Sequence, residues 1–341
     1  MRGRLLTVAV NAIGFAAAAA VAVAAGVHFQ DVTGAVPPPQ VRAAARLPLL
    51  PDLGVYEPTS PRSYSGVTEF SRLIRRSPNI AVYYSSWWEP FRVPFARAAK
   101  AHHATPMVQI EPKDVNLASI AAGRYDSYVR AYARAVRSFR QPVILAFGHE
   151  MNATWYSWGF GHTPAAAFVA AWRHIHQVFA AAGARNVRWL WTVNVVGPQA
   201  NAIKGWWPGA EYVTWVGIDG HYFQPSIRFP ALFGATLGQI RKLTNEPVLI
   251  AESGIAPFVQ INRITDLFAG AWAHGLLGVV WFDVKGHNLR IEHHPAAIAA
   301  FRQAVSKYFK AAASGHPGTA ASSHAARIRR ATFRPRSSGR G

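Results

Sequence analysis

The chain has 341 residues, of which 50% are hydrophobic and 15% are charged, so it is long and apolar enough to bury the core of a large domain. It contains no cysteine, which excludes a disulfide framework and thiolate metal sites. Its formal charge of +20 predicts attraction to an anionic envelope, membrane or polysaccharide. The sequence lacks the basic-aromatic motifs of RNA- and DNA-binding modules, so no nucleic-acid partner is expected.

The N-terminal residues 1–26 have the pattern of an export signal or membrane anchor. Arg2 and Arg4 precede an almost wholly apolar run, Leu5–Ala25. This run is long enough to cross a bilayer if it is not cleaved, so cleavage and anchoring both stay open. The protein is therefore expected to be secreted or membrane-anchored, outside the cytoplasm. Residues 27–50, which include three consecutive prolines, are predicted to be a linker.

Residues 51–310 alternate short apolar runs with helical patterns. The candidate strands are Gly54–Tyr56, Ile80–Ser85, Pro106–Glu111, Val143–Gly148, Val187–Asn194, Val213–Asp219, Val248–Glu252 and Val279–Asp283. The helix after the fourth strand is predicted to have Thr163 as its N-cap, Pro164 in its first turn and Gly183 at its end. This alternation predicts one α/β domain, a (β/α)8 TIM barrel. A doubly wound open sheet is the alternative, but no Gly-rich phosphate loop follows the first strand.

The C-terminal residues 311–341 consist mainly of Ala, Ser, Gly, Pro and Arg, without any acidic residue. Such a composition predicts a disordered tail. Its arginines are Arg327, Arg329, Arg330, Arg334, Arg336 and Arg340. This tail is interpreted either as a cationic arm for an anionic cell envelope or as a solvated segment with no specific partner.

Two of the apolar strands end in a glutamate. The first runs from Pro142 through an unbroken apolar stretch to Gly148-His149-Glu150-Met151-Asn152, and the second leads from Pro247 to Glu252. Parallel barrels build their active sites at the carboxyl ends of their strands, and the fourth and seventh strands can face one another across the mouth. A pair of carboxylates placed in this way can cleave a glycosidic bond. Glu150 and Glu252 are therefore the predicted catalytic pair.

These motifs resemble glycoside hydrolase family 26, the β-mannanase-type family. The stretch Gly148–Asn152, followed by Trp155 and Trp158, is similar to the family's acid/base motif. Farther along, Trp215–Gly220 resembles its sixth strand, Ile250–Gly254 its nucleophile strand and Trp281 its eighth-strand tryptophan. The resemblance covers residues 51–305 and implies a (β/α)8 barrel and a retaining reaction, with Glu150 as acid/base and Glu252 as nucleophile. It also implies a substrate among the β-1,4-mannans, mixed-linkage β-glucans and β-1,3-xylan.

A retaining mechanism requires two carboxyl groups about 5–5.5 Å apart whose pKa values differ. We expect apolar neighbours, Trp155 among them, to raise the pKa of Glu150, and hydrogen bonds to keep Glu252 ionised. The family has a tyrosine directly after its Asp-Gly pair, where this chain has His221. Either Tyr222 or His221 is therefore expected to hold the nucleophile.

Further candidates for substrate binding lie at the predicted strand tips, since aromatic rings pack on the apolar faces of sugars. They are Trp88, Glu111, His149, Trp155, Trp158, Asp219, His221, Tyr222 and Trp281. Glu111 belongs to a Glu-Pro step that also occurs at Glu57 and Glu89. Because proline ends a central strand, all three glutamates are expected to point into the mouth.

The function predicted from these residues is a retaining endo-β-glycanase that hydrolyses a polysaccharide such as β-mannan and acts as a monomer. The histidine pairs lack a matching acidic cluster, so neither a metal nor another cofactor is expected. One alternative is a β-1,3/1,4-glucanase, a xylanase or a transglycosylase that uses the same two glutamates. The other is a surface polysaccharide-binding protein without catalytic activity.

Overall fold

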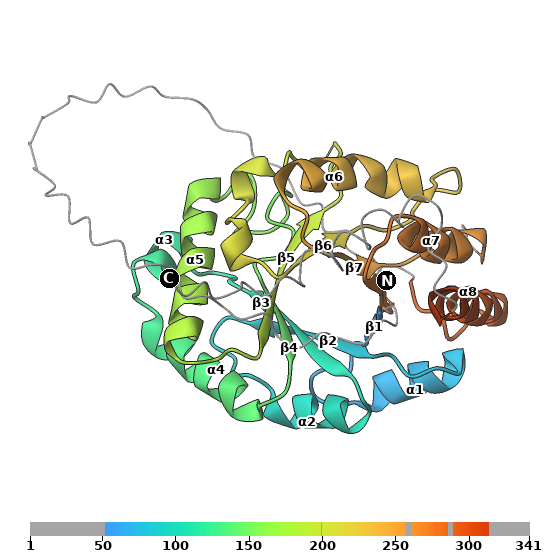
Figure 1. Cartoon of the computed structure of the whole chain (residues 1–341), viewed down its shortest axis with the longest axis horizontal. Coiled ribbons are helices and arrows are strands. Elements are labelled where there is room, and N and C mark those ends of the chain that lie inside the picture. The colour runs from blue at the N-terminus through green and yellow to red at the C-terminus, as the bar shows by residue number, and fades with distance from the viewer. Residues whose placement is uncertain (1–51, 199, 257–260, 286–288, 314–341) are drawn as a thin grey trace, which may run out of the picture. The chain divides into compact units, whose positions relative to one another are not determined.

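A computed structural model describes residues 52–313 apart from residues 199, 257–260 and 286–288. Eight parallel strands pair in sequence order and close into a barrel, with β1 paired to both β2 and β8. The helices surround the strands (Figure 1). The predicted (β/α)8 fold is thus confirmed. The predicted export segment, the linker and the tail beyond Ala313 lie outside the described residues.

The predicted strands agree with those of the structure to within two residues at each end. The strands are β1 (Asp52–Tyr56), β2 (Ile80–Ser86), β3 (Thr105–Glu111), β4 (Val143–Phe147), β5 (Val187–Asn194), β6 (Trp215–Asp219), β7 (Val248–Ser253) and β8 (Gly278–Phe282). The helices are α1 (Ser65–Ile74), α2 (Val93–Ala101), α3 (Leu117–Ala121), α4 (Asp126–Phe139), α5 (Ala165–Ala181), α6 (Phe229–Leu243), α7 (Ile261–Ala273) and α8 (Pro295–Ala313). Two short 3₁₀ turns, η1 (Lys204–Trp206) and η2 (Ala210–Tyr212), lie between β5 and β6.

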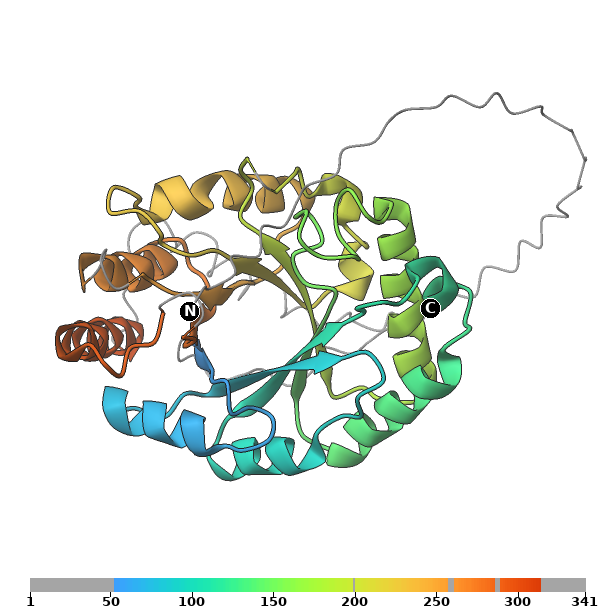
Figure 2. The same cartoon turned by 180° about the vertical axis from the view of Figure 1, so that it is seen from behind.

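Alternate side chains of each strand face the barrel interior and the helices, as the two-residue period of a strand requires. The interior is filled by a layer that contains Ile80, Val82, Met107, Ile144, Leu190, Leu249 and Val280. The helices form a ring around the strands (Figure 2). The opposite faces of the strands pack against these helices in a second, larger apolar cluster. Because the interior is packed with side chains, polar groups can meet substrate only at an end of the barrel.

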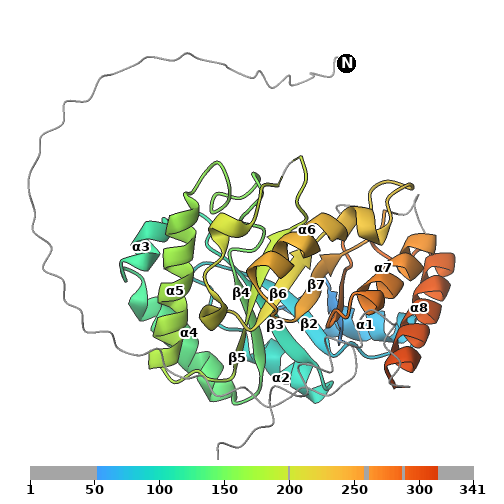
Figure 3. The same ribbon diagram turned by 45° about the horizontal axis from the view of Figure 1, so that its top comes forward.

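The start of α5 differs from the prediction. Pro164 occupies the N-cap position in extended backbone, and the hydroxyl of Thr163 donates instead to the carbonyl oxygen of Ser157, at 2.9 Å. This contact fixes the long loop between β4 and α5, which with the loop after β5 stands above the helices in Figure 3. The predicted helix end at Gly183 agrees, since its φ of +74° suits glycine two residues after the last helical residue.

A register shift in β7 decides which way Glu252 points. Leu249 and Ala251 face the interior, so strict alternation would turn Glu252 outward, toward the helices. The pairing of β6 with β7 advances from Ile218–Ile250 to Asp219–Glu252, which inserts one extra residue into β7. Such a bulge re-aims the side chains that follow it. Glu252 consequently enters the mouth of the barrel.

The end of β4 is bent by two residues with left-handed backbone. Gly148 has φ +56° and Glu150 has φ +53°. A Cβ atom at position 148 would lie 3.0 Å from the ring of Phe168 and 3.2 Å from that of Trp158, so both space and conformation favour glycine there. Left-handed backbone is uncommon at a glutamate and is often found at functional sites, so Glu150 is held in a conformation that its surroundings impose.

Candidate active site

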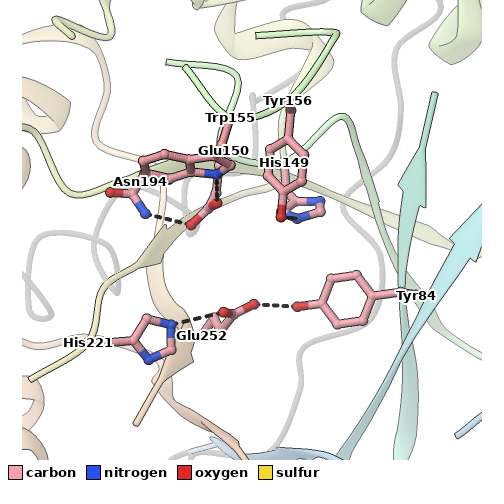
Figure 4. A network of polar contacts seen from close by, with 8 residues as sticks. All are labelled: Tyr84, His149, Glu150, Trp155, Tyr156, Asn194, His221 and Glu252. Atoms are coloured by element: carbon pink, nitrogen blue, oxygen red, sulfur yellow. Dashed lines mark hydrogen bonds and ion pairs between the residues drawn. The ribbon is translucent and has the colours of Figure 1, made fainter. Parts of the chain in front are cut away.

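Glu150 lies at the end of β4, buried among polar and aromatic groups. Its Oε2 accepts a hydrogen bond of 2.7 Å from the indole Nε1 of Trp155, and its Oε1 accepts one from the side-chain amide of Asn194 at the end of β5 (Figure 4). Asn194 is itself held by Asn152, whose amide group exchanges hydrogen bonds with the backbone N–H and C=O of Asn194. The motif Gly148–Asn152 therefore supplies both the carboxyl group and the residue that orients its partner.

Glu252 lies across the mouth from Glu150, and the two carboxyl groups face a common space (Figure 4). Its Oε2 accepts a hydrogen bond from the hydroxyl of Tyr84, which comes from the inner face of β2. Its Oε1 lies 2.9 Å from Nε2 of His221, which follows β6. Two donors from opposite sides of the barrel thus hold one carboxylate.

The two glutamates have opposite pKa shifts. Burial, and next the negative charge of Glu252, raise the pKa of Glu150 to about 7, although Asn194 and Trp155 act to lower it. Burial also acts to raise the pKa of Glu252, but the hydrogen bond and charge of His221 and the hydrogen bond of Tyr84 outweigh it, so the pKa lies below its ordinary value. Below about pH 7 the pair therefore contains a protonated Glu150 and an ionised Glu252.

Asp219 is a third carboxyl group beside this pair. It ends β6, pairs in register with Glu252 and is completely buried. Burial raises the pKa of Asp219 well above its ordinary value, and the charges of Glu252 and Glu150 raise it further. Because Asp219 is completely buried, it is not exposed to a substrate from the mouth, contrary to its prediction as a substrate-binding residue.

His149 and its aromatic neighbours form a wall beside the two glutamates (Figure 4). His149 is 2% exposed, its Nε2 lies 3.1 Å from the hydroxyl of Tyr156, and its ring contacts Tyr84 edge-on. Burial lowers the pKa of His149 to about 4, so its imidazole is neutral at neutral pH. Trp158 stacks on Tyr156 and donates to the carbonyl oxygen of His149. Because Trp158 is only 2% exposed, it supports this wall, and its prediction as a substrate contact was wrong.

Two other predicted contacts face away from the mouth. Tyr222 is buried, and its hydroxyl donates to Asp266 on α7, so His221 and not Tyr222 holds Glu252. Trp281 is 2% exposed and packs edge-on against Phe301 of α8. In both cases alternation along the chain turns the side chain toward the helices. The mouth instead receives the next residue, Phe282, whose ring stacks on Tyr56 and lies near His221.

The three Glu-Pro steps have different environments. Glu111 is half-buried at the end of β3, and burial together with the charge of Glu252 acts to raise its pKa. Glu89 pairs with Arg92 in an exposed ion pair. Glu57 is 3% exposed and shares a hydrogen bond with Asp283, where burial and the charge of Asp283 raise its pKa to about 9. Only Glu111 therefore remains as a candidate contact at the mouth.

The rim of the mouth carries exposed aromatic side chains. Trp88 is 59% exposed and Trp155 45% exposed. Trp88 has left-handed backbone, with φ +77°, and is held by edge-on contacts with Trp87 and Tyr125. Their prediction as substrate-binding residues is compatible with this exposure.

Sequence reasoning missed Tyr84, Asn194 and Phe282. Each is a polar or aromatic residue near the carboxyl end of a predicted strand, and Tyr84 continues the inward alternation of Ile80 and Val82. That alternation was a signal that could have identified Tyr84. Among the described residues, no three His, Cys, Asp or Glu side chains are grouped so that they could hold a metal ion. No helix of the described part is long and apolar enough to cross a membrane.

Comparison with known proteins gives similarities in sequence and in structure. The family model of Glycosyl hydrolase family 26 matches residues 103–266, which include both Glu150 and Glu252. Endoglucanase H of Acetivibrio thermocellus is 28% identical over 273 residues, which cover 74% of this chain and 30% of the relative. A β-1,3-xylanase, TXYA, of a Vibrio species is 31% identical over 109 residues, which cover 31% of this chain and 22% of the relative. The chain thus spans less than a third of the length of these relatives.

Solved structures with the same fold include two mannanases. The modular endo-β-1,4-mannanase of Cellulomonas fimi has a TM-score of 0.60 at 14% identity and covers 75% of this chain and 70% of that one. The catalytic domain of the family 26 endo-β-1,4-mannanase of Bacillus sp. JAMB-750 has a TM-score of 0.58 at 14% identity, with coverage of 76% and 86%. At such identities the likeness shows the fold alone. The family-model match over both glutamate strands and this shared fold make the chain similar to glycosyl hydrolase family 26.

Proposed function

We propose that this protein is a retaining endo-β-glycanase in which Glu150 is the general acid/base and Glu252 the nucleophile. One observation carries the proposal: the two carboxyl groups face one another, and the pKa of Glu150 is raised to about 7 while that of Glu252 is lowered. A pair of carboxyl groups whose pKa values are separated in this way can act as acid and nucleophile at the same pH.

In the first step, an oxygen of Glu252 attacks the anomeric carbon while Glu150 gives its proton to the glycosidic oxygen. The bond to the leaving sugar breaks and a glycosyl ester of Glu252 forms. As the charge of Glu252 is consumed, the pKa of Glu150 falls, because that charge was one of the causes of its elevation. Glu150 is thereby prepared to act as a base.

In the second step, Glu150 takes a proton from a water molecule, whose oxygen attacks the same carbon and releases Glu252. Two inversions give net retention of configuration. Trp155 and Asn194 donate to both oxygens of Glu150, and hold the carboxyl group in one place through both steps. A sugar hydroxyl in place of water would make the reaction a transglycosylation.

The charge of the mouth and the names of the relatives support a neutral β-glycan as the substrate. The ionised Glu252 brings negative charge to the mouth and Glu111 adds another carboxyl group there, which disfavours an anionic glycan and favours a neutral one. The relative that matches 74% of the chain is an endoglucanase, which favours a β-glucan. β-Mannan is the second candidate, because the mannanases share the fold.

The proposal is tested by incubating the protein with lichenan, β-mannan, β-1,3-xylan and cellulose, and measuring reducing ends and the anomer first released. We expect a fall in viscosity before most of the reducing ends appear, and a product that retains the β configuration. An inverted product would contradict the assignment of Glu252 as nucleophile. Binding to these polymers without any release of reducing ends would favour a non-catalytic polysaccharide-binding protein.

The pH dependence of kcat/KM should follow the two glutamates. The value of kcat/KM should rise with pH as Glu252 loses its proton, at a pH below 4.5 because its pKa is lowered from that value. It should fall again as Glu150 loses its proton, at a pKa of about 7. The profile should therefore be bell-shaped with its maximum between these values. If kcat/KM already falls near pH 5, the group whose loss of a proton ends activity is not Glu150.

Replacing Tyr84 with Phe should move the acidic limb of kcat/KM upward by about one pH unit, because the lost hydrogen bond favours the ionised form of Glu252. Tyr83→Phe is the matched control. Tyr83 is the preceding residue of β2, and its hydroxyl accepts from the backbone of Arg92 on the opposite face. If the acidic limb of kcat/KM lies at the same pH in both variants, Tyr84 does not set the pKa of Glu252.

A further inference from the structure

The amino end of the barrel, opposite the mouth, carries arginine or histidine side chains on most segments that join a helix to the following strand. The arginines are Arg75, Arg76, Arg140 and Arg185, and the histidines are His102, His103 and His274. These described segments contain one acidic side chain, Glu246, which is half-buried. The segments are 75–79, 102–104, 140–142, 182–186, 244–247 and 274–277. The mouth, in contrast, has several carboxylates. The charge of the barrel is therefore unequal at its two ends.

A pocket of about 510 Å³ opens at this basic end, between the last turn of α1 and α8. Its cations are Arg75, Arg76, Arg302 and Lys310, and no carboxylate lines it. The guanidinium of Arg76 lies 3.5 Å from the centre of the Phe309 ring, and Nε of Arg302 donates to the carbonyl oxygen of Leu73 at 2.7 Å. Two of the cations are thus fixed in place before any ligand binds.

Compensation of helix dipoles explains part of this charge, since cations stabilise helix C-termini. It does not explain why four cations from two helices converge on one concavity, because like charges at short range repel. A bound anion would relieve this repulsion. The arrangement is the kind that recognises phosphate, where arginine donates to two oxygens at once.

The course of the chain indicates which anion. β1 begins at Asp52 and α8 ends at Ala313, and both positions lie at the basic end, since helices run back from the mouth. The sequence that precedes Asp52 contains the apolar run Leu5–Ala25, and the sequence that follows Ala313 contains the arginines of the tail. A bilayer with anionic headgroups is one partner that an apolar run, a cationic tail and a cationic pocket can all bind.

We infer that the basic end of the barrel docks on an anionic phospholipid bilayer, with a headgroup phosphate in the α1–α8 pocket. The mouth then faces away from the membrane, where a polysaccharide can reach it. Attraction of this kind weakens with salt, because the Debye length is about 8 Å at physiological ionic strength. The inference does not depend on the proposed hydrolysis.

The experiment uses the full chain, which has no cysteine and so accepts a single label. An environment-sensitive dye is placed on Ser77→Cys, exposed at the basic end, or on Ser157→Cys, exposed in the loop after β4. Vesicles of phosphatidylcholine alone are compared with vesicles that contain phosphatidylglycerol. We expect the dye at position 77 to respond to the anionic vesicles and the dye at position 157 not to respond, whether or not the N-terminal segment inserts into both kinds of vesicle.

The double variant Arg75→Gln and Lys310→Gln neutralises two cations of the pocket. It should raise the lipid concentration that gives half of the dye response at position 77 on the order of 30-fold. Arg124→Gln with Lys204→Gln removes the same charge from exposed sites in the connections after β3 and β5, and should raise that concentration far less. Both double variants should hydrolyse a soluble glycan as the unaltered chain does. Equal responses at the two dye positions, or equal loss in the two double variants, would overturn the inference. A response to soluble polygalacturonate but not to anionic vesicles would also overturn it.

Discussion

Replacing Glu252 with Gln is expected to reduce kcat/KM by more than about 10⁴-fold, because an amide cannot form the glycosyl ester on which the reaction depends. The barrel should remain folded, since Gln keeps the size of Glu and its amide can accept a hydrogen bond from one of Tyr84 and His221 while it donates to the other. The measurement is the release of reducing ends from the best polysaccharide of the panel, together with the thermal unfolding midpoint. The substitution also removes the negative charge that raises the pKa of Glu150.

Glu246→Gln is the matched control for this prediction. Glu246 lies just before β7, at the opposite end of this strand from Glu252, and is half-buried. It should retain activity within about twofold. A Glu252→Gln variant with ordinary turnover would refute the nucleophile assignment, whereas inactivity of both variants together with a lower unfolding midpoint would indicate damage to the fold.

Replacing Glu150 with Gln is expected to reduce hydrolysis of polysaccharide by about 10²–10⁴-fold, the range for loss of a general acid/base. The loss should depend on the leaving group. An aryl glycoside whose phenolate leaves without a proton should still glycosylate Glu252, and the ester should then accumulate, because no base activates the water molecule. The measurement is a burst of released phenol followed by a slow steady state.

Azide distinguishes this role from a structural one. It attacks the accumulated ester without needing a base, so it should restore turnover of the Glu150→Gln variant and give a glycosyl azide of the β configuration. Trp155→Phe, which removes one donor to Glu150 but keeps the carboxyl group, should not need azide. An equal loss for all leaving groups, without a burst or rescue, would contradict the acid/base assignment of Glu150.

The replacement of a tyrosine by His221 distinguishes this chain from the pattern of the family it resembles. A tyrosine donates one hydrogen bond from a neutral hydroxyl, whereas His221 can also bring charge to Glu252, and both its hydrogen bond and its charge lower the pKa of that carboxyl. Tyr84, from the other side of the mouth, supplies the neutral donor. Glu252, the proposed nucleophile, thus keeps a lowered pKa in a site where burial alone would raise it.

The sequence by itself determined the barrel and the two glutamates. Eight apolar runs that alternate with helical patterns are compatible with few folds besides a (β/α)8 barrel. A strand that is buried on both faces is a continuous apolar run, which can be recognised without knowing the neighbouring strands. Strand ends could be located to within two residues for the same reason. Glu150 and Glu252 followed, because a carboxylate directly after such a strand must lie at the end of the barrel where sites form.

The tertiary structure alone decided which neighbouring side chains serve these glutamates. Whether Phe282 or Trp281, and His221 or Tyr222, enters the mouth depends on a shift of one residue, which reverses the direction of a side chain. The bulge in β7 that turns Glu252 inward depends on its pairing with β6. Tyr84 meets Glu252 across 168 positions of sequence, a contact that closure of the barrel creates. Local patterns specify each strand, but the direction and partners of its last side chains depend on strands that are distant in the sequence.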